Sequence, residues 1–102
     1  MSKQELKQKI KEAVEKDPLK DNIQRVSLFG SYVHGDFKED SDVDVLIEFT
    51  PTAKVGFFKY FDIRENIEKH LQKKVDLLTP EALSKYFKDE VLKEAEIIYE
   101  RR

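Results

Sequence analysis

The sequence predicts a single α/β (α+β) domain over residues 1–102, in which helices pack mainly on one face of a small mixed β-sheet. Two observations lead to this fold class. A chain of 102 residues has room for one modest hydrophobic core. Apolar residues recur at helical spacing in some segments and alternate with polar residues in others. Helices that pack on one face leave the other face of the sheet partly open.

The N-terminal quarter of the chain predicts one helix and one strand. Residues 3–16 have the pattern of an amphipathic helix, and residues 23–29 that of an apolar strand. The helix ends before Pro18, because the residue that precedes a proline disfavours the helical conformation. The apolar face of this helix consists of Leu6, Ile10, Ala13 and Val14.

A glycine and a serine follow the first strand and predict a short helical turn. Gly30 interrupts the strand, and Ser31 is expected to be the N-cap of a turn that ends near Gly35. Residues 36–41 form a charged loop. A second strand is expected next, because alternate residues belong to two sets that would face opposite sides of a sheet. One set is Val43, Val45 and Ile47, and the other is Asp42, Asp44, Leu46 and Glu48.

The second half predicts two further helices and a short strand. Residues 57–71 are expected to be helical, with Phe57, Tyr60, Ile67 and Leu71 on the main apolar stripe. Residues 75–78 form a strand. A helix then starts at residues 79–81, because threonine, proline and glutamate suit its first turn. Leu83, Phe87, Val91 and Ala95 continue that helix. Residues 97–99 either extend it or form a last strand.

Composition excludes several classes of function. The net charge is only −2 and both signs are mixed along the chain, which argues against binding nucleic acid through a basic stripe. The chain has no cysteine, so it has neither disulfides nor a thiolate metal site. No apolar run reaches membrane-span length, and the N-terminus is polar rather than a signal peptide. We therefore expect a cytoplasmic protein that does not bind membranes.

Three aspartates predict a site for hard cations. Asp42 and Asp44 stand at alternate strand positions, so we expect both side chains on one face. Asp76 lies inside the apolar run of residues 75–78, where an unpaired acid is costly. Oxygen ligands select Mg²⁺ or Mn²⁺ over Zn²⁺. If the three carboxylates converge, they could hold two metal ions about 4 Å apart, as used for in-line displacement at phosphorus.

The turn at Gly30 and Ser31 supplies the matching phosphate site. Glycine permits close approach of the backbone, and the first amides of the following turn can donate to a phosphate. Each feature has an ordinary alternative when it stands alone. The turn could be only a capped turn, the two aspartates a solvated strand face or a calcium loop, and Asp76 an edge-strand acid facing water. Their conjunction at this spacing favours metal-assisted phosphoryl chemistry.

These motifs resemble the signature of the DNA polymerase beta-like nucleotidyltransferase superfamily. The matching segments are Phe29-Gly30-Ser31, Gly35, residues 41–46 and residues 74–83. The small size is similar to that of the minimal nucleotidyltransferases, which are often the antitoxin half of a gene pair with a HEPN-type toxin. The resemblance implies the nucleotidyltransferase fold, metal-binding and catalytic roles for Asp42, Asp44 and Asp76, and contacts from Gly30 and Ser31 to the phosphates of ATP. Some members transfer AMP from ATP to a tyrosine of the toxin.

The chain departs from the family pattern just after the serine. Minimal members often have Gly-Ser-Arg-Ala-Arg-Gly, whereas residues 30–35 here are Gly-Ser-Tyr-Val-His-Gly. His34 takes the second basic position and is expected to contact a nucleotide phosphate when protonated. The alternative is a surface or capping histidine.

A chain of this size has no further residues to select an acceptor, so a protein partner or a homodimer could complete the site. Phe57, Phe58, Tyr60 and Phe61 cluster at the start of one helix, and Phe58 lies off its apolar stripe. An exposed aromatic pair there would mark a contact surface, unless another segment covers it. The leading hypothesis is AMP transfer to a protein hydroxyl. The alternatives are an antitoxin that acts by binding and occlusion, and a plain magnesium- or calcium-binding domain.

Overall fold

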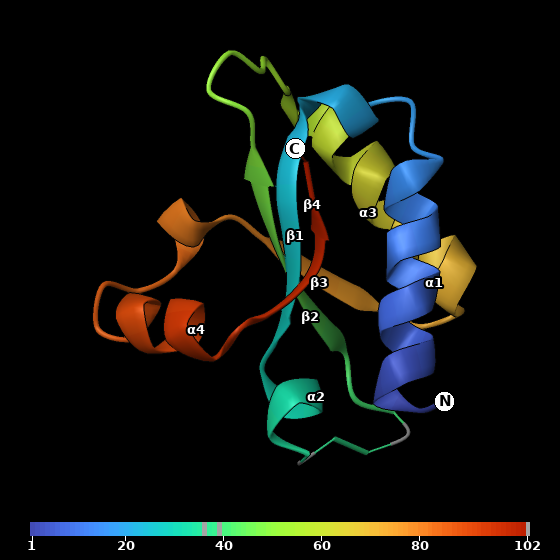
Figure 1. Ribbon diagram of the computed structural model, residues 1–102, viewed down its shortest axis with the longest axis vertical. Helices are drawn as coiled ribbons and strands as arrows, with labels where there is room; N and C mark the ends of the chain where they lie inside the picture. Colours follow the sequence, from blue (N-terminus) through green and yellow to red (C-terminus); the bar gives the residue numbers. More distant parts are fainter. Residues whose placement is uncertain (36, 39, 102) are drawn as a thin grey trace.

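A computed structural model shows a four-stranded sheet with two long helices on one face (Figure 1). The structure describes residues 1–35, 37–38 and 40–101. The expected charged loop over residues 36–41 therefore lies partly outside the described residues. The strands are β1 (Ile23–Phe29), β2 (Val43–Phe49), β3 (Val75–Leu78) and β4 (Glu96–Glu100). The helices are α1 (Lys3–Glu15), α2 (Ser31–His34), α3 (Phe57–Leu71) and α4 (Lys88–Glu94).

The sheet is mixed, as the sequence predicts. Its strand order is β3-β2-β1-β4. β1 pairs antiparallel with both β2 and β4, whereas β2 pairs parallel with β3. The segment over residues 97–99, which the sequence left open, is thus a strand at the edge of the sheet. Its pairing with β1 joins the C-terminal part of the chain to the centre of the fold.

The hydrophobic core lies between the sheet and the two long helices. α1 and α3 pack against each other and cover the same face of the sheet (Figure 1). The four residues predicted for the apolar face of α1 are all buried, as are the alternating valines and isoleucine of β2. Leu46 is also buried but lies outside this core cluster, on the second face. The alternation of β2 therefore separates the core side from the side that carries the carboxylates.

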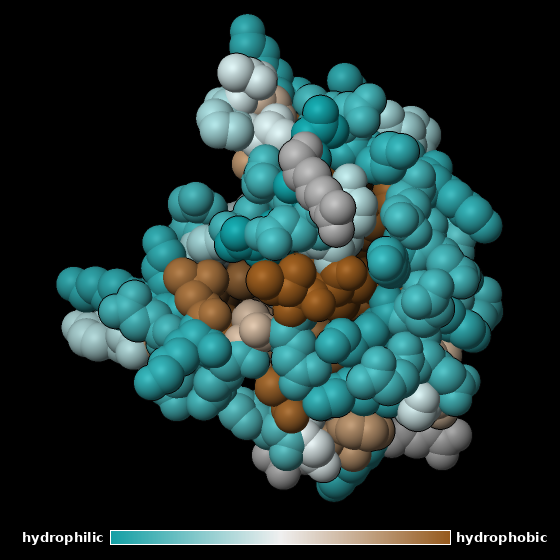
Figure 2. Space-filling model, viewed as in Figure 1, coloured by the Kyte–Doolittle hydropathy of each residue, from teal (hydrophilic) through white to brown (hydrophobic). Residues whose placement is uncertain are grey.

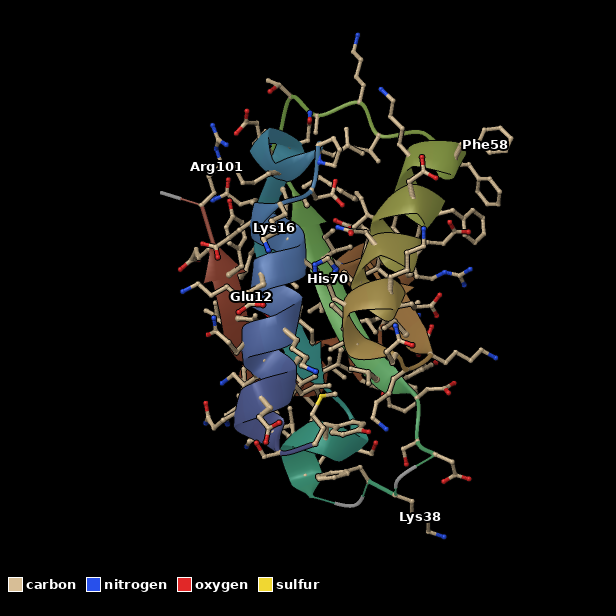
Figure 3. All side chains as sticks on the ribbon, turned by 90° about the vertical axis from the view of Figure 1, so that its right-hand side faces the viewer. Glu12, Lys16, Lys38, Phe58, His70 and Arg101 are labelled. Carbon is tan, nitrogen blue, oxygen red and sulfur yellow. The ribbon has the colours of Figure 1, made fainter. Side chains whose placement is uncertain are left out.

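Two expectations about α3 and the segment after β3 are wrong. Phe57 is 70% exposed, and the buried residues of α3 are Ile63, Ile67 and Leu71. The apolar stripe therefore begins one turn later than predicted, at Tyr60, which is partly buried against the core. Figure 3 shows Phe58 at this end, pointing away from the protein. Its 82% exposure agrees with its predicted place off the stripe.

The predicted long helix from residue 79 to residue 95 is two separate pieces. A short 3₁₀ turn, Pro80–Ala82, follows β3, and Leu83 is extended before α4 begins at Lys88. α4 buries none of its residues, and Phe87 is 59% exposed. The apolar residues of α4 are exposed or only partly buried, because α4 lies at the second face of the sheet, away from α1 and α3 (Figure 1).

Ion pairs fix the N-terminal helix to the edge strand. Lys3 Nζ lies 3.0 Å from Glu96 Oε2, and Lys7 Nζ lies 3.2 Å from Glu96 Oε1. The hydrogen bond from Lys3 is the main cause that lowers the pKa of Glu96, and Lys7 adds to it. The two ion pairs connect the first turns of α1 with the start of β4.

We expect Glu96→Gln to reduce the free energy of unfolding at neutral pH by about 0.2–1 kcal/mol, the usual range for exposed pairs. Because the folded-state pKa of Glu96 lies below its unfolded value, this stabilisation is present above the unfolded pKa and is lost as the pH falls through the folded pKa. Urea unfolding across the acid range measures the effect. Glu15→Gln, an exposed position at the end of α1, is the charge-matched control, and equal losses in both variants would contradict the prediction.

Candidate active site

The turn between β1 and α2 is built on a glycine that contacts a carboxylate. Gly30 has φ 77° and ψ −146°, a backbone conformation essentially restricted to glycine. A Cβ atom at residue 30 would lie 2.1 Å from Asp44 Oδ2. The Asp44 carboxylate therefore packs directly on the backbone of the turn. Both the conformation and the contact require glycine at this position.

The same carboxylate takes the place of a helix cap. Ser31 is not the N-cap of α2, as the sequence suggested; Gly30 occupies the N-cap, and no side chain caps the helix. Instead, the Asp44 carboxylate accepts a hydrogen bond from the backbone N–H of Ser31. An acceptor from the neighbouring strand thus satisfies an N–H that a capping side chain would otherwise bind.

The other two predicted carboxylates flank Asp44 at the same end of the sheet. Asp76 is the register partner of Asp44 in the parallel β2–β3 pair, so both residues lie on the same face. The side chain of Asp76 is exposed, although its neighbours Val75 and Leu77 are buried. Asp42 precedes the first residue of β2 and is also exposed.

The electrostatics of the three acids suit a cation. Partial burial is the largest cause that raises the pKa of Asp44, and the negative charges of Asp76 and Asp42 raise it further. The hydrogen bond from Ser31 opposes this effect. Within the described parts of the chain, no group of three His, Cys, Asp or Glu side chains is arranged closely enough to hold a metal ion without rearrangement. The donor set fits a hard divalent cation, because a cation would relieve the repulsion that raises the pKa of Asp44.

Helix α3 holds the strand that carries Asp76. The hydroxyl of Tyr60 donates to the carbonyl oxygen of Leu77, and the N–H of Val75 donates to Glu68 Oε2 at 2.8 Å. These bonds cover the outer edge of β3, which has no strand beyond it. Sequence reasoning placed Tyr60 in the core and did not identify Glu68. The position of Glu68, one turn before the end of the helix and shortly before β3, was the signal in the sequence for this contact.

His34, predicted to contact a phosphate, has a protein partner in the structure. Its Nε2 atom lies 2.9 Å from Glu94 Oε2, and both side chains are about half-exposed. The pair connects the last residue of α2 with the last residue of α4. Glu94 has no local sequence signal for this contact, because sixty residues separate it from His34. The structure thus brings α4 next to the turn that begins at Gly30.

The two glycines with positive φ provide a matched test of the contact with Asp44. Gly35 has φ 80°, but a Cβ atom there would meet nothing within 4 Å. We expect Gly35→Ala to reduce the free energy of unfolding by about 1–2 kcal/mol, the cost of the left-handed conformation. Gly30→Ala should cost more, because ψ −146° is less accessible to alanine than the left-handed helical conformation of Gly35 and because the methyl group also displaces the Asp44 carboxylate. Chemical unfolding of both variants measures this difference, and equal losses would show that Asp44 does not press on the turn.

Comparisons with known proteins agree with the motifs and the geometry. A model of the family described as polymerase beta nucleotidyltransferase matches residues 8–102. The chain is 36% identical over 72 residues to the protein adenylyltransferase MntA of Thermococcus cleftensis, which covers 71% of this chain and 71% of that protein.

Two solved structures of toxin–antitoxin complexes share the fold. One contains AMP-PNP and aligns with a TM-score of 0.70 at 21% identity, over 94% of this chain and 74% of that chain. The other holds a tri-AMPylated HEPN toxin of Shewanella oneidensis in complex with an MNT antitoxin. It aligns with a TM-score of 0.66 at 18% identity, over 97% of this chain and 73% of that chain. The nucleotidyltransferase fold and the predicted resemblance are confirmed, and the chain belongs to the polymerase beta nucleotidyltransferase family.

Proposed function

We propose that this protein transfers AMP from ATP to a hydroxyl of a partner protein, a tyrosine of a HEPN-type toxin, and so acts as an antitoxin. The observation that carries the proposal is the contact of the Asp44 carboxylate with the turn at Gly30 and Ser31, with Asp76 in register beside it. This arrangement joins a phosphate-sized turn to a cluster of acids. The relative from Thermococcus cleftensis is a protein adenylyltransferase, and a structural neighbour contains an AMPylated HEPN toxin.

The chain's own residues would position the reactants. The Ser31 hydroxyl can donate to the β- and γ-phosphates. The backbone N–H of Ser31 already binds Asp44, and those of Val33 and His34 bind the Gly30 carbonyl oxygen. Asp42, Asp44 and Asp76 would hold two Mg²⁺ or Mn²⁺ ions. Such ions, when bound, neutralise negative charge on the phosphates. The use of ATP would place the reaction in the cytoplasm. No helix within the described residues is long and apolar enough to cross a membrane.

The proposed step is an in-line displacement at the α-phosphorus. The acceptor oxygen forms a bond to phosphorus while the bond from phosphorus to the pyrophosphate oxygen breaks. Pyrophosphate leaves with the bonding electron pair, and the hydroxyl proton passes to one of the site carboxylates. The products are an AMP–protein phosphodiester and pyrophosphate. Catalysis in this scheme comes from positioning and charge stabilisation.

Transfer of label from ATP labelled at the α-phosphate tests the proposal. The purified protein is incubated with Mg²⁺, the labelled nucleotide and a co-purified or co-expressed HEPN-type partner. We expect label on the partner. The Asp42→Asn/Asp44→Asn double variant should transfer label about 10²-fold more slowly or worse, since it lacks two carboxylates that would stabilise charge in the site. Asp62→Asn, at an exposed aspartate of α3, is the control and should transfer normally.

The outcome of the same experiment separates transfer from occlusion. A protein that acts by occlusion would transfer no label, yet its double variant would still bind and inhibit the partner. Label on the partner with the unmodified protein alone supports AMP transfer. Omission of Mg²⁺, or addition of a chelator, should abolish the labelling, and labelling that persists would contradict the metal dependence.

His34 gives a separate test of the nucleotide contacts. We propose that it contacts a phosphate, in exchange for its pairing with Glu94. His34→Gln should then weaken ATP binding by about two- to tenfold, the value of one hydrogen bond. Glu94→Gln removes the same ion pair but leaves the imidazole, so it should bind ATP at least as well as the unmodified protein. Calorimetric titration with ATP measures both, and parallel losses would assign His34 only to the link with α4.

A further inference from the structure

A small pocket on the second face of the sheet lies next to the carboxylate cluster. It has a volume of about 220 Å³. β1, β2, β4 and the end of α4 contribute its walls. The lining residues are Arg25, Ser27, Leu46, Glu48, Leu92, Ala95 and Ile97. Figure 2, in the same view as Figure 1, shows apolar surface in the middle of this view, running from β4 toward α4.

The register of the strands fixes the distance between the pocket and the site. In the β1–β2 pair, Asp44 lies opposite Phe29 and Leu46 lies opposite Ser27. Leu46 follows Asp44 by two residues, roughly 7 Å along a strand, and points to the same face. The turn at Gly30 lies on the other side of Asp44, at the end of β1. The carboxylates thus stand between the phosphate-binding turn and the pocket.

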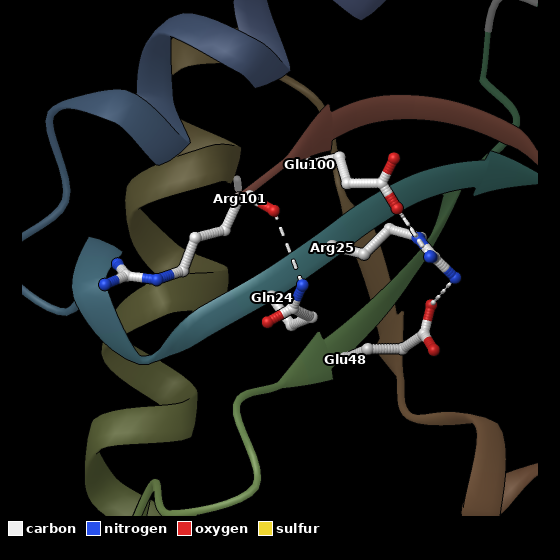
Figure 4. Close-up of polar contacts among 5 residues, drawn as sticks. All are labelled: Gln24, Arg25, Glu48, Glu100 and Arg101. Atoms are coloured by element: carbon white, nitrogen blue, oxygen red, sulfur yellow. Dashed lines mark hydrogen bonds and ion pairs between the residues drawn. The ribbon is translucent and has the colours of Figure 1, made fainter.

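The chemistry of the walls suits a ring rather than a phosphate. Leu46, Leu92 and Ile97 supply apolar contacts, and Ser27 supplies a hydroxyl. Among the lining residues that the structure describes, Arg25 is the one cation, and it is already paired. Its Nε donates to Glu100 Oε2 at 2.7 Å, and its Nη1 lies 3.4 Å from Glu48 Oε2 (Figure 4). The hydrogen bond to Glu100 is the main cause that raises the pKa of Arg25. The pocket thus offers no unpaired positive charge to a triphosphate.

The volume of the pocket and the direction of attack on phosphorus together indicate which group binds in the pocket. The volume lies below the range of about 300–1,000 Å³ that is typical for whole ligands, so the pocket can take one ring. In-line displacement places the attacking oxygen and the leaving pyrophosphate on opposite sides of phosphorus. If pyrophosphate leaves at Gly30 and Ser31, the attacking hydroxyl approaches from the pocket. The nucleoside is joined to phosphorus through a different oxygen, which does not lie on the line between the attacking and leaving oxygens. The nucleoside therefore does not point along this line into the pocket.

We propose that the pocket between the sheet and α4 is the acceptor subsite, and that it binds the phenol ring of the acceptor tyrosine with its hydroxyl directed at Asp44 and Asp76. This inference rests on the proposed AMP transfer and adds where and how the acceptor binds. The exposed Leu92 of α4 forms one wall, so this helix selects the acceptor. Leu92→Trp should fill the pocket without disturbing the core, because α4 buries none of its residues.

The test uses N-acetyltyrosinamide as the acceptor probe, with two readouts. In the first, methyl NMR of the unmodified protein should show shifts at Leu46, Leu92 and Ile97 when the probe is added, and no such shifts with adenosine. In the second, transfer of AMP to the probe is measured kinetically. Leu92→Trp should raise the KM for the probe by about tenfold or more, a typical effect of blocking an apolar subsite, with an unchanged Kd for ATP. Lys93→Trp, at the next and exposed position of α4, should leave both values unchanged.

The two readouts keep this inference distinguishable from the proposed function. Absence of methyl shifts with the probe, shifts with adenosine instead, or an unchanged KM in Leu92→Trp would each overturn the acceptor subsite, even if AMP transfer occurs. Weaker ATP binding in Leu92→Trp would assign the pocket to the nucleotide and would also overturn it. If the unmodified protein transfers AMP to neither the probe nor a partner, the proposed function fails, and the methyl titration still reports whether the pocket binds a phenol.

Discussion

The contact between the Gly30 backbone and the Asp44 carboxylate is the constraint on which the site depends. It joins the end of β1 to the start of β2, and the two residues are brought together by the register in which Phe29 lies opposite Asp44. That register is fixed by the core, because a slip of one residue would turn Val45 outward and Asp44 inward. The hydrophobic pattern of the strand therefore also positions the candidate site.

The third carboxylate depends on a different part of the fold. Asp76 sits on an edge strand of only four residues, and such a strand gains little from its own pairing. α3 compensates with two hydrogen bonds to the outer edge, from Tyr60 and to Glu68, while Ile63 and Ile67 anchor the helix in the core. The helix that stabilises the first face of the sheet thus also holds a residue of the second face in place.

The sequence predicted best those elements whose hydrophobic pattern matches their burial. The ranges 23–29, 57–71 and 75–78 agree with the structure at both ends. The segment from residue 79 to residue 95 was wrong, because periodicity reveals an apolar face but not whether a surface exists to cover it. The exposed Phe87 shows that here none does. The placement of Asp44 and Asp76 on one face of the sheet is confirmed, while their metal-binding role stays a prediction. The pairing of His34 with Glu94 depends on a long-range contact that no local pattern encodes.

The two faces of the sheet consequently have different roles. Packing on α1 and α3 supplies the buried apolar residues, so the opposite face can carry charges and a pocket without loss of the core. α4 belongs to this second face, and the contact between Glu94 and His34 places it beside the turn at Gly30. Substitutions in α4 cost little stability, since it buries no residue. A segment of this kind can therefore vary in sequence while the contact of Gly30 with Asp44 and the register of Asp76 stay unchanged.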